Sequence, residues 1–266
     1  MAAGPQTESV IEVAGTILHT GVWGAGAPQL VLLHDGLGSI AQWREFPADL
    51  AAATGLTVLA YDRAGHGRST PTPSGGWPAD WLAREADVLG ELLRVVGIDD
   101  PVLVGHSDGG SIAAIHASRS SRTAPLVLLA AHSWMEPIIA ESIEASLPNR
   151  DDLVARLARF HDQPDALFDA WSLVWTSSAF ADWDMRPSLS SIVCPTLVVQ
   201  GVDDEYASPE HASSTAAAIG ENAAVAFLPD AGHLLHRSQP KRLVEVVADF
   251  INAQRSSDPT SETPEI

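Results

Sequence analysis

The sequence predicts an α/β fold in which a mostly parallel central sheet carries helices on both faces. Short apolar runs bounded by Gly, Pro and Asp alternate with segments of helical periodicity along nearly the whole chain, which is the pattern of repeated strand and helix units. With 266 residues, 45% of them hydrophobic, the chain is long enough to bury one large core, or one core with a modest insertion.

The sequence predicts an N-terminal hairpin followed by six buried strands. An N-terminal hairpin is expected over Ile11 to Trp23, with its turn at Ala14-Gly15. The later apolar runs are short, continuous and flanked by turn residues, as buried strands are. These runs are Leu30 to His34, Leu56 to Tyr61, Val102 to Gly105, Leu126 to Ala131, Thr196 to Gly201 and Ala224 to Leu228.

Two helices are the clearest. One is expected over Trp81 to Val96. The other is the last helix of the chain, which has Pro240 near its start. Its apolar residues recur at the spacing of one buried helix face; they are Leu243, Val246, Val247, Phe250 and Ile251.

The alternation stops between residues 134 and 190, where the sequence is helical and rich in tryptophan. We therefore expect an α/β core built from residues 1–133 and 191–255, with a helical cap inserted at 134–190 over the edge of the sheet. The polar, proline-bearing tail, 256–266, is predicted to be disordered.

The composition argues against some classes of partner and indicates the cellular compartment. A formal net charge of −19 argues against nucleic acid and anionic membranes, because a polyanion is repelled by such a surface. The single cysteine, Cys194, rules out an internal disulfide and fits a buried thiol in a reducing compartment. The sequence shows neither a leader pattern nor a long apolar span. We expect a cytoplasmic protein with a small-molecule substrate, and a homo-oligomer stays open.

The segment Gly105-His106-Ser107-Asp108-Gly109 follows an apolar run directly. This is the G-x-S-x-G nucleophile elbow, a tight turn from strand to helix that projects the serine hydroxyl. The structural alternative is a glycine-rich turn in which Ser107 only caps a helix.

A serine hydroxyl needs a base and an acid that orients the base. Asp203-Asp204-Glu205 follows the strand expected at Thr196, and His233 follows the next strand, with His236 as a rival histidine. Only one of the three acids is needed, and the other two are expected to form a solvated turn. Because ligands bind at the carboxyl ends of strands in open α/β sheets, both groups are expected at one edge. The order serine, acid, histidine is that of the elbow-bearing hydrolases.

Taken together, these residues resemble the α/β-hydrolase superfamily over about Val10 to Ala253. The resemblance implies Ser107 as nucleophile, His233 as general base and Asp204, three residues after the turn glycine, as its orienting acid. The matching motifs are Leu32-Leu33-His34 with Gly36 to Ser39, Tyr61-Asp62-Arg63-Ala64-Gly65-His66-Gly67-Arg68-Ser69, the elbow, Gly201 to Asp204, and Ala231-Gly232-His233.

The same resemblance implies an oxyanion hole built from the backbone N–H groups of Gly36 and Asp108, with Leu37 as an alternative to Gly36. It implies neither a cofactor nor a metal ion. His34, His66 and His106 are expected to pack or hydrogen-bond behind the site.

Two carboxylates depart from the superfamily pattern. Asp35 stands where glycine is usual, and Asp108 directly follows the nucleophile. Asp108 can be explained by the favourable position of a carboxylate in the first turn of a helix. Asp35 either hydrogen-bonds within its own loop or contacts a polar group of the substrate. Trp171, Trp175 and Trp183 in the cap are expected to contact the substrate, although aromatic residues at helical spacing also pack a cap onto its core.

The expected activity is hydrolysis of a small, mainly apolar carboxylic ester or lactone through an acyl-enzyme on Ser107. One alternative is a carbon–carbon bond hydrolase of a ring-cleavage product, which would need a basic residue for the substrate carboxylate; the cap offers Arg156, Arg159 and Arg186. Another is a slow-turnover ligand-binding protein on the same fold.

Overall fold

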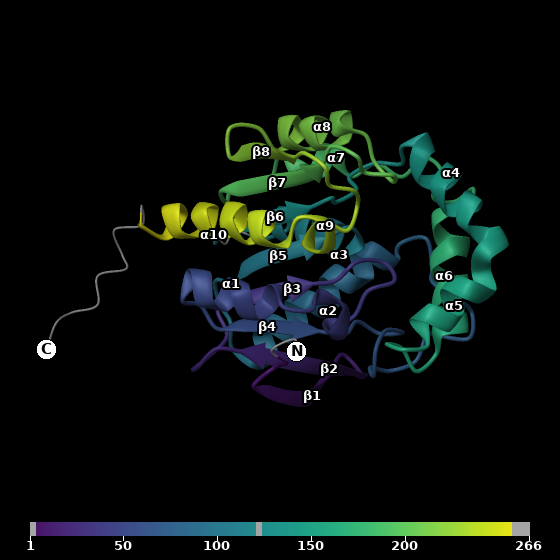
Figure 1. Ribbon diagram of the computed structural model, residues 1–266, viewed down its shortest axis with the longest axis horizontal. Helices are drawn as coiled ribbons and strands as arrows, with labels where there is room; N and C mark the ends of the chain where they lie inside the picture. The colour runs from purple at the N-terminus through teal and green to yellow at the C-terminus, as the bar shows by residue number, and fades with distance from the viewer. Residues whose placement is uncertain (1–3, 121–123, 257–266) are drawn as a thin grey trace, which may run out of the picture.

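The computed structural model describes residues 4–120 and 124–256, and their strands form one eight-stranded sheet (Figure 1). The strand order is β1-β2-β4-β3-β5-β6-β7-β8. The bounds are β1 Thr7–Val13, β2 Thr16–Trp23, β3 Leu30–Leu33, β4 Val58–Tyr61, β5 Val102–His106, β6 Leu126–Leu129, β7 Thr196–Gly201 and β8 Ala223–Leu228.

The predicted hairpin is confirmed, although β1 begins earlier than expected, at Thr7. Strands β1 and β2 pair antiparallel around Ala14 and Gly15, whose φ angles of 51° and 78° suit the two-residue turns that match the twist of a hairpin. Strand β2 pairs antiparallel with β4, and the strands from β4 to β8 are parallel. The prediction of a mostly parallel sheet is therefore confirmed.

Helices cover both faces of the sheet (Figure 1). One apolar cluster packs α2, α3 and α8 against one face, and a second cluster packs α1 and α10 against the other. The bounds are α1 Phe46–Thr54, α2 Trp81–Val96, α3 Asp108–Ser118, α8 Pro209–Ile219, α9 Leu235–Ser238 and α10 Pro240–Ser256.

Both helices expected from periodicity are present. Helix α2 has the predicted bounds, and α10 begins at Pro240 as expected. Within α10, Leu243, Val247 and Ile251 are fully buried, whereas Val246 and Phe250 lie half-buried at the margin of the same stripe. The helical spacing therefore identified the buried face and part of its border.

The prediction for the last strand is wrong in one respect. It was expected to be buried, but β8 is an edge strand, and Phe227 is 41% exposed. A continuous apolar run does not distinguish a central strand from an edge strand, because the number of neighbouring strands is a property of the tertiary fold.

The segment between residues 134 and 190 places three helices beyond the carboxyl ends of the parallel strands, at the right of Figure 1. Its two ends lie together, since Trp134 and Asp184 form an isolated bridge. The short helix α7 packs on α3 and α8 rather than on the other cap helices. The bounds are α4 Pro137–Ser146, η2 Leu147–Asn149, α5 Arg150–Leu157, α6 Pro164–Trp175 and α7 Arg186–Leu189.

The predicted tail is only partly described. Helix α10 continues to Ser256, so the prediction of disorder is wrong for that residue. Residues 257–266 of the predicted tail lie outside the described residues. Across 4–120 and 124–256, no helix is both long enough and apolar enough to cross a membrane.

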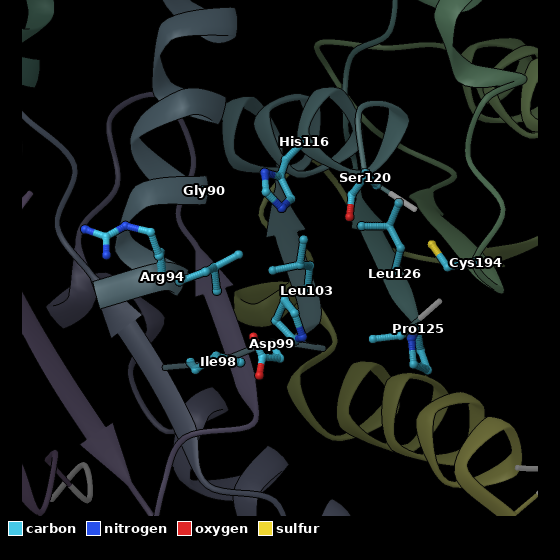
Figure 2. Close-up of a pocket in the computed structure, with 14 residues that line it drawn as sticks. Gly90, Arg94, Ile98, Asp99, Leu103, His116, Ser120, Pro125, Leu126 and Cys194 are labelled. Atoms are coloured by element: carbon cyan, nitrogen blue, oxygen red, sulfur yellow. The ribbon is translucent and has the colours of Figure 1, made fainter. Parts of the chain in front are cut away.

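A cavity of about 260 Å³ lies at the amino ends of β5 and β6, between α2 and α3 (Figure 2). Its lining includes Leu103, His116, Leu126 and Cys194. Cys194 is buried, as expected, and burial raises the pKa of its thiol. None of the residues around this cavity belongs to the predicted site at the opposite end of the strands.

Candidate active site

Ser107 occupies the turn between β5 and α3 with φ 53° and ψ −120°, a strained conformation for a residue with a side chain. The flanking glycines make the turn possible. A Cβ atom on Gly105 would overlap the backbone of Gly109, and one on Gly109 would overlap the carbonyl oxygen of Leu33. The elbow therefore needs glycine at both positions for steric reasons, as its spacing predicts.

The structure brings the three predicted catalytic side chains together. The hydroxyl oxygen of Ser107 lies 2.9 Å from His233 Nε2. On the other side of the imidazole, Nδ1 lies 3.1 Å from Asp204 Oδ1 and 3.0 Å from Asp204 Oδ2. When His233 Nδ1 carries the proton and donates to Asp204, Nε2 is free to accept a proton from Ser107.

Asp204 is held by two further donors. Its Oδ1 accepts from the backbone N–H of Tyr206 at 2.8 Å, and its Oδ2 accepts from Gln200 Nε2 at 2.6 Å. Although burial opposes it, the charge and hydrogen bond of His233 and the Tyr206 N–H together lower the pKa of Asp204. Burial likewise opposes the charged form of His233, but Asp204 outweighs it and raises the pKa of the imidazole.

Within the described chain, the two acids next to Asp204 and the rival histidine, His236, make no hydrogen bond to Ser107. Asp203 is exposed, as expected for a solvated turn. Glu205 is exposed too, as expected, and its Oε2 also accepts the backbone N–H of His233 at 3.0 Å, so it supports the base. His236 is buried and packs against the rings of Trp43 and His106, away from Ser107.

The loop after β3 is fixed by donors that hold its carbonyl groups. His34 Nδ1 and Arg63 Nη2 each lie 2.8 Å from the carbonyl oxygen of Asp35, and His66 Nε2 lies 3.0 Å from that of Gly36. Within the described part of the chain, the backbone N–H groups of Gly36, Leu37 and Asp108 donate to no other group. These N–H groups therefore remain available to a ligand beside Ser107.

The histidines of the motifs support the site from behind, as expected. His106 Nε2 lies 2.8 Å from the carbonyl oxygen of His233 and so fixes the backbone of the base. Burial lowers the pKa of His106 to about 4, which leaves the ring neutral and able to donate this bond.

Asp108 lies deep in the site. Its side chain is almost fully buried, and its Oδ2 has no hydrogen-bond partner among the described residues. A Cβ atom added to Gly36 would lie 2.6 Å from this oxygen and 2.5 Å from Trp171 Nε1, so only glycine fits between them. Burial raises the pKa of the Asp108 carboxyl to about 6, against the opposing charge of Arg63.

Asp35 folds back on its own loop. Its Oδ1 lies against Gly38 without a hydrogen-bond partner in the described chain, and its Oδ2 lies 3.8 Å from His106 Nδ1. The side chain also faces the cavity in front of Ser107.

That cavity has a volume of about 320 Å³ and lies between the carboxyl ends of the strands and the cap. Trp171 and Trp175 line it, as expected. Trp183 does not; its ring packs against Trp175 and Phe180, so its predicted place in the substrate pocket is wrong. The cavity is lined by the predicted groups Asp35, Gly36, Leu37, Ser107, Asp108 and His233, by Gln42, His132, Glu205, Tyr206, Leu234 and Arg237, and by the cap residues Ile139, Ile143, Leu153, Arg156, Leu157, Phe160, Trp171 and Trp175.

Sequence reasoning missed several of these groups. The ring of His132 stacks on that of His233, with centroids 5.6 Å apart, and its Nδ1 has no partner in the described chain. The ring of Tyr206 also packs against that of His233, with centroids 4.8 Å apart. Because His132 follows β6 as His233 follows β8, the rule that ligands meet the carboxyl ends of strands could have identified it.

No group of three His, Cys, Asp and Glu side chains within 4–120 and 124–256 is arranged to hold a metal ion.

Known proteins resemble this chain in sequence and in fold. The profile described as the alpha/beta hydrolase family matches residues 30–246. A non-heme haloperoxidase of Rhodococcus erythropolis is 27% identical over 90% of this chain and 94% of its own length. A 2-hydroxy-6-oxononadienedioate/2-hydroxy-6-oxononatrienedioate hydrolase of Cupriavidus pinatubonensis is 28% identical over 88% of this chain and 90% of its own.

The solved structure of the enol-lactonase from Burkholderia xenovorans superposes with a TM-score of 0.70 and 22% identity, over 91% of this chain and 99% of that one. At this identity the likeness shows the fold alone. The eight-stranded sheet is thus an α/β-hydrolase fold, and the relatives support hydrolase chemistry of this type without fixing a substrate.

Proposed function

Because this chain belongs to the alpha/beta hydrolase family, we propose that it is a serine hydrolase that cleaves a small, mainly apolar carboxylic ester or lactone. One observation carries the proposal. The hydroxyl of Ser107 lies 2.9 Å from an imidazole whose far nitrogen faces the buried carboxylate of Asp204. This geometry suits proton transfer from the nucleophile to the base at the moment of attack.

In the proposed reaction, Ser107 Oγ attacks the carbonyl carbon while His233 Nε2 takes the hydroxyl proton. The tetrahedral intermediate collapses, the C–O bond of the ester breaks, and the leaving alkoxide takes that proton from His233. Water then attacks the acyl-enzyme and gives one proton to His233 Nε2. The acid departs as the Ser107–acyl bond breaks, and the proton returns to Ser107.

The negative charge of each tetrahedral intermediate is assigned to the N–H of Asp108 together with that of Gly36 or Leu37. These N–H groups have no other acceptor in the described chain, and the loop carbonyls are held away by His34, His66 and Arg63. Donors already oriented in this way stabilise the developing charge without reorganising during the reaction.

The size and lining of the cavity support a small acyl group. A volume of about 320 Å³ is at the lower end of the range of ligand pockets, roughly 300–1,000 Å³. The cap contributes mainly apolar walls, among them Ile139, Ile143, Leu157, Trp171 and Trp175.

A fluorophosphonate probe tests the nucleophile. We expect it to label the wild-type protein and to leave Ser107→Ala unlabelled, with an unchanged circular dichroism spectrum for the variant. Labelling that survives the substitution would remove Ser107 from the mechanism. A panel of esters, lactones, thioesters and keto acids, measured against both proteins, then identifies the substrate class.

Two arginines favour a second candidate. Arg156 of the cap and Arg237 near His233 both line the cavity, where they could pair with a substrate carboxylate. A carbon–carbon bond hydrolase of a dienoic keto acid would use such a pair. Turnover of a dienoic keto acid that exceeds turnover of p-nitrophenyl esters would select this candidate over ester hydrolysis.

A further inference from the structure

The proposed oxyanion hole contains a carboxylate that the reaction does not use. Asp108 would donate its backbone N–H to the oxyanion, yet its own side chain lines the same cavity and is almost fully buried. A negative charge at this position opposes the negative charge that forms on the substrate oxygen. A substrate that leaves Asp108 unpaired is therefore poorly matched to the site.

The protein satisfies this carboxylate only in part: the Trp175 side chain interacts with it and lowers its pKa, but one of its oxygens has no hydrogen bond among the described residues. Asp108 Oδ2 has no hydrogen-bond partner in the described chain. Arg63 acts on it only through space: its Nη2 donates to the carbonyl oxygen of Asp35, and its Nε and Nη1 make no hydrogen bond there. A buried carboxylate oxygen without a hydrogen bond is unfavourable, and a ligand that supplies a charged donor removes that penalty.

The surroundings fit a cationic donor better than a neutral one. Asp35 and Glu205 add two carboxylates to the same cavity, and the indole rings of Trp171 and Trp175 form part of its wall. Carboxylates next to aromatic rings recognise ammonium groups by charge and by attraction to the ring electrons. Two arginines also line the cavity. Arg156 lies on the cap helix α5, and the guanidinium of Arg237 donates a hydrogen bond to the side chain of Gln42.

We propose that Asp108 binds a protonated amine adjacent to the scissile carbonyl, so that the preferred substrates are esters of amino acids. The inference rests on the proposed serine hydrolase function. An ammonium group on the α-carbon lies two bonds from the carbonyl carbon, and Asp108 directly follows the residue that attacks this carbon. The ammonium would donate to Asp108 and offset the charge that opposes the oxyanion.

Two esters that differ only in the amine test the proposal: the p-nitrophenyl ester of L-alanine and p-nitrophenyl propionate, each corrected for spontaneous hydrolysis. For the wild type, we expect kcat/KM to favour the alanine ester by about 10- to 100-fold, the range of a hydrogen bond between charged groups. In Asp108→Asn this preference should fall at least about tenfold. Asp152→Asn, which removes an exposed carboxylate of α5, is the matched control and should keep the wild-type preference.

A second measurement protects the test against loss of folding or activity in the Asp108 variant. L-alaninamide should inhibit the wild type at lower concentration than propionamide does, and the advantage should disappear as the pH rises above the pKa of the amine. Equal inhibition by the two amides, or an equal preference for the two esters in wild type and Asp108→Asn, overturns the proposal.

The serine hydrolase function and the role of Asp108 are tested separately. If Ser107→Ala still hydrolyses propionate ester, the serine hydrolase function is wrong. If hydrolysis requires Ser107 but the wild type shows no preference for the ammonium ester, only the assignment of Asp108 is wrong.

Discussion

Replacing Asp204 by Asn should reduce kcat about 10⁴-fold on any ester that the protein hydrolyses. The carboxylate receives three donors, from His233 Nδ1, Gln200 Nε2 and the Tyr206 N–H. An amide offers only one oxygen for them, and its NH2 group facing Nδ1 favours the tautomer that cannot accept the Ser107 proton. At 3.0 Å and an effective dielectric constant of about 20, the lost attraction to the imidazolium is about 5 kcal/mol, or roughly four powers of ten.

The assay is the pH dependence of kcat/KM for a p-nitrophenyl ester. In the wild type, Asp204 raises the pKa of His233, so activity should fall as the pH decreases through a value above 6.5. In Asp204→Asn the raising effect is lost, and the acid limb of the residual activity should move to lower pH. The exposed Asp203→Asn is the matched control. A loss below about tenfold in Asp204→Asn, or an equal loss in both variants, refutes this account of the acid.

Two further predictions concern the core and the cap. Burial raises the pKa of the Glu85 carboxyl to about 7 against the opposing charge of Arg63, so the folded state holds this proton more tightly than the unfolded chain does. As the pH rises from about 4.5 to 7, the unfolding free energy of the wild type should therefore fall by up to about 3 kcal/mol relative to that of Glu85→Gln. Urea denaturation at pH 4 and pH 8 measures this difference. An equal pH dependence of the unfolding free energy in both proteins contradicts a buried charge at Glu85. Trp171→Phe should change the butyrate to hexanoate ratio of kcat/KM by about tenfold, because Trp171 lines the cavity, whereas Trp183→Phe should leave it unchanged; equal effects would place Trp183 in the pocket.

The features predicted best from the sequence are those fixed by local constraints. The elbow around Ser107 was recognisable because a strained turn restricts its neighbours to glycine, and this restriction is visible as spacing. The choice of Asp204 over Asp203 followed from the resemblance to the superfamily, and the structure buries the first and exposes the second. The parallel strands were recognisable because burial on both faces leaves short, continuous apolar runs.

Features set by tertiary packing were not predicted. Trp183 carries the same apolar signal as Trp171 and Trp175, but packing behind Trp175 removes it from the cavity. Glu205 looked like one more acid of an exposed turn, and only the return of the chain at His233 gives its carboxylate a partner. Contacts between residues far apart in the sequence decided each of these outcomes, and no local pattern encodes them.

The charge balance beneath Ser107 depends on Arg63. This guanidinium is fully buried, holds the Asp35 carbonyl and lowers the pKa of Asp108 against the effect of burial. A long-range attraction of this kind favours the ionised form of Asp108, yet within the described chain it leaves Oδ2 without a hydrogen bond. Arg63 therefore preserves the negative charge without satisfying it. A site arranged in this way favours whichever substrate brings its own positive charge, and this is the physical reason to look for an amine beside the scissile carbonyl.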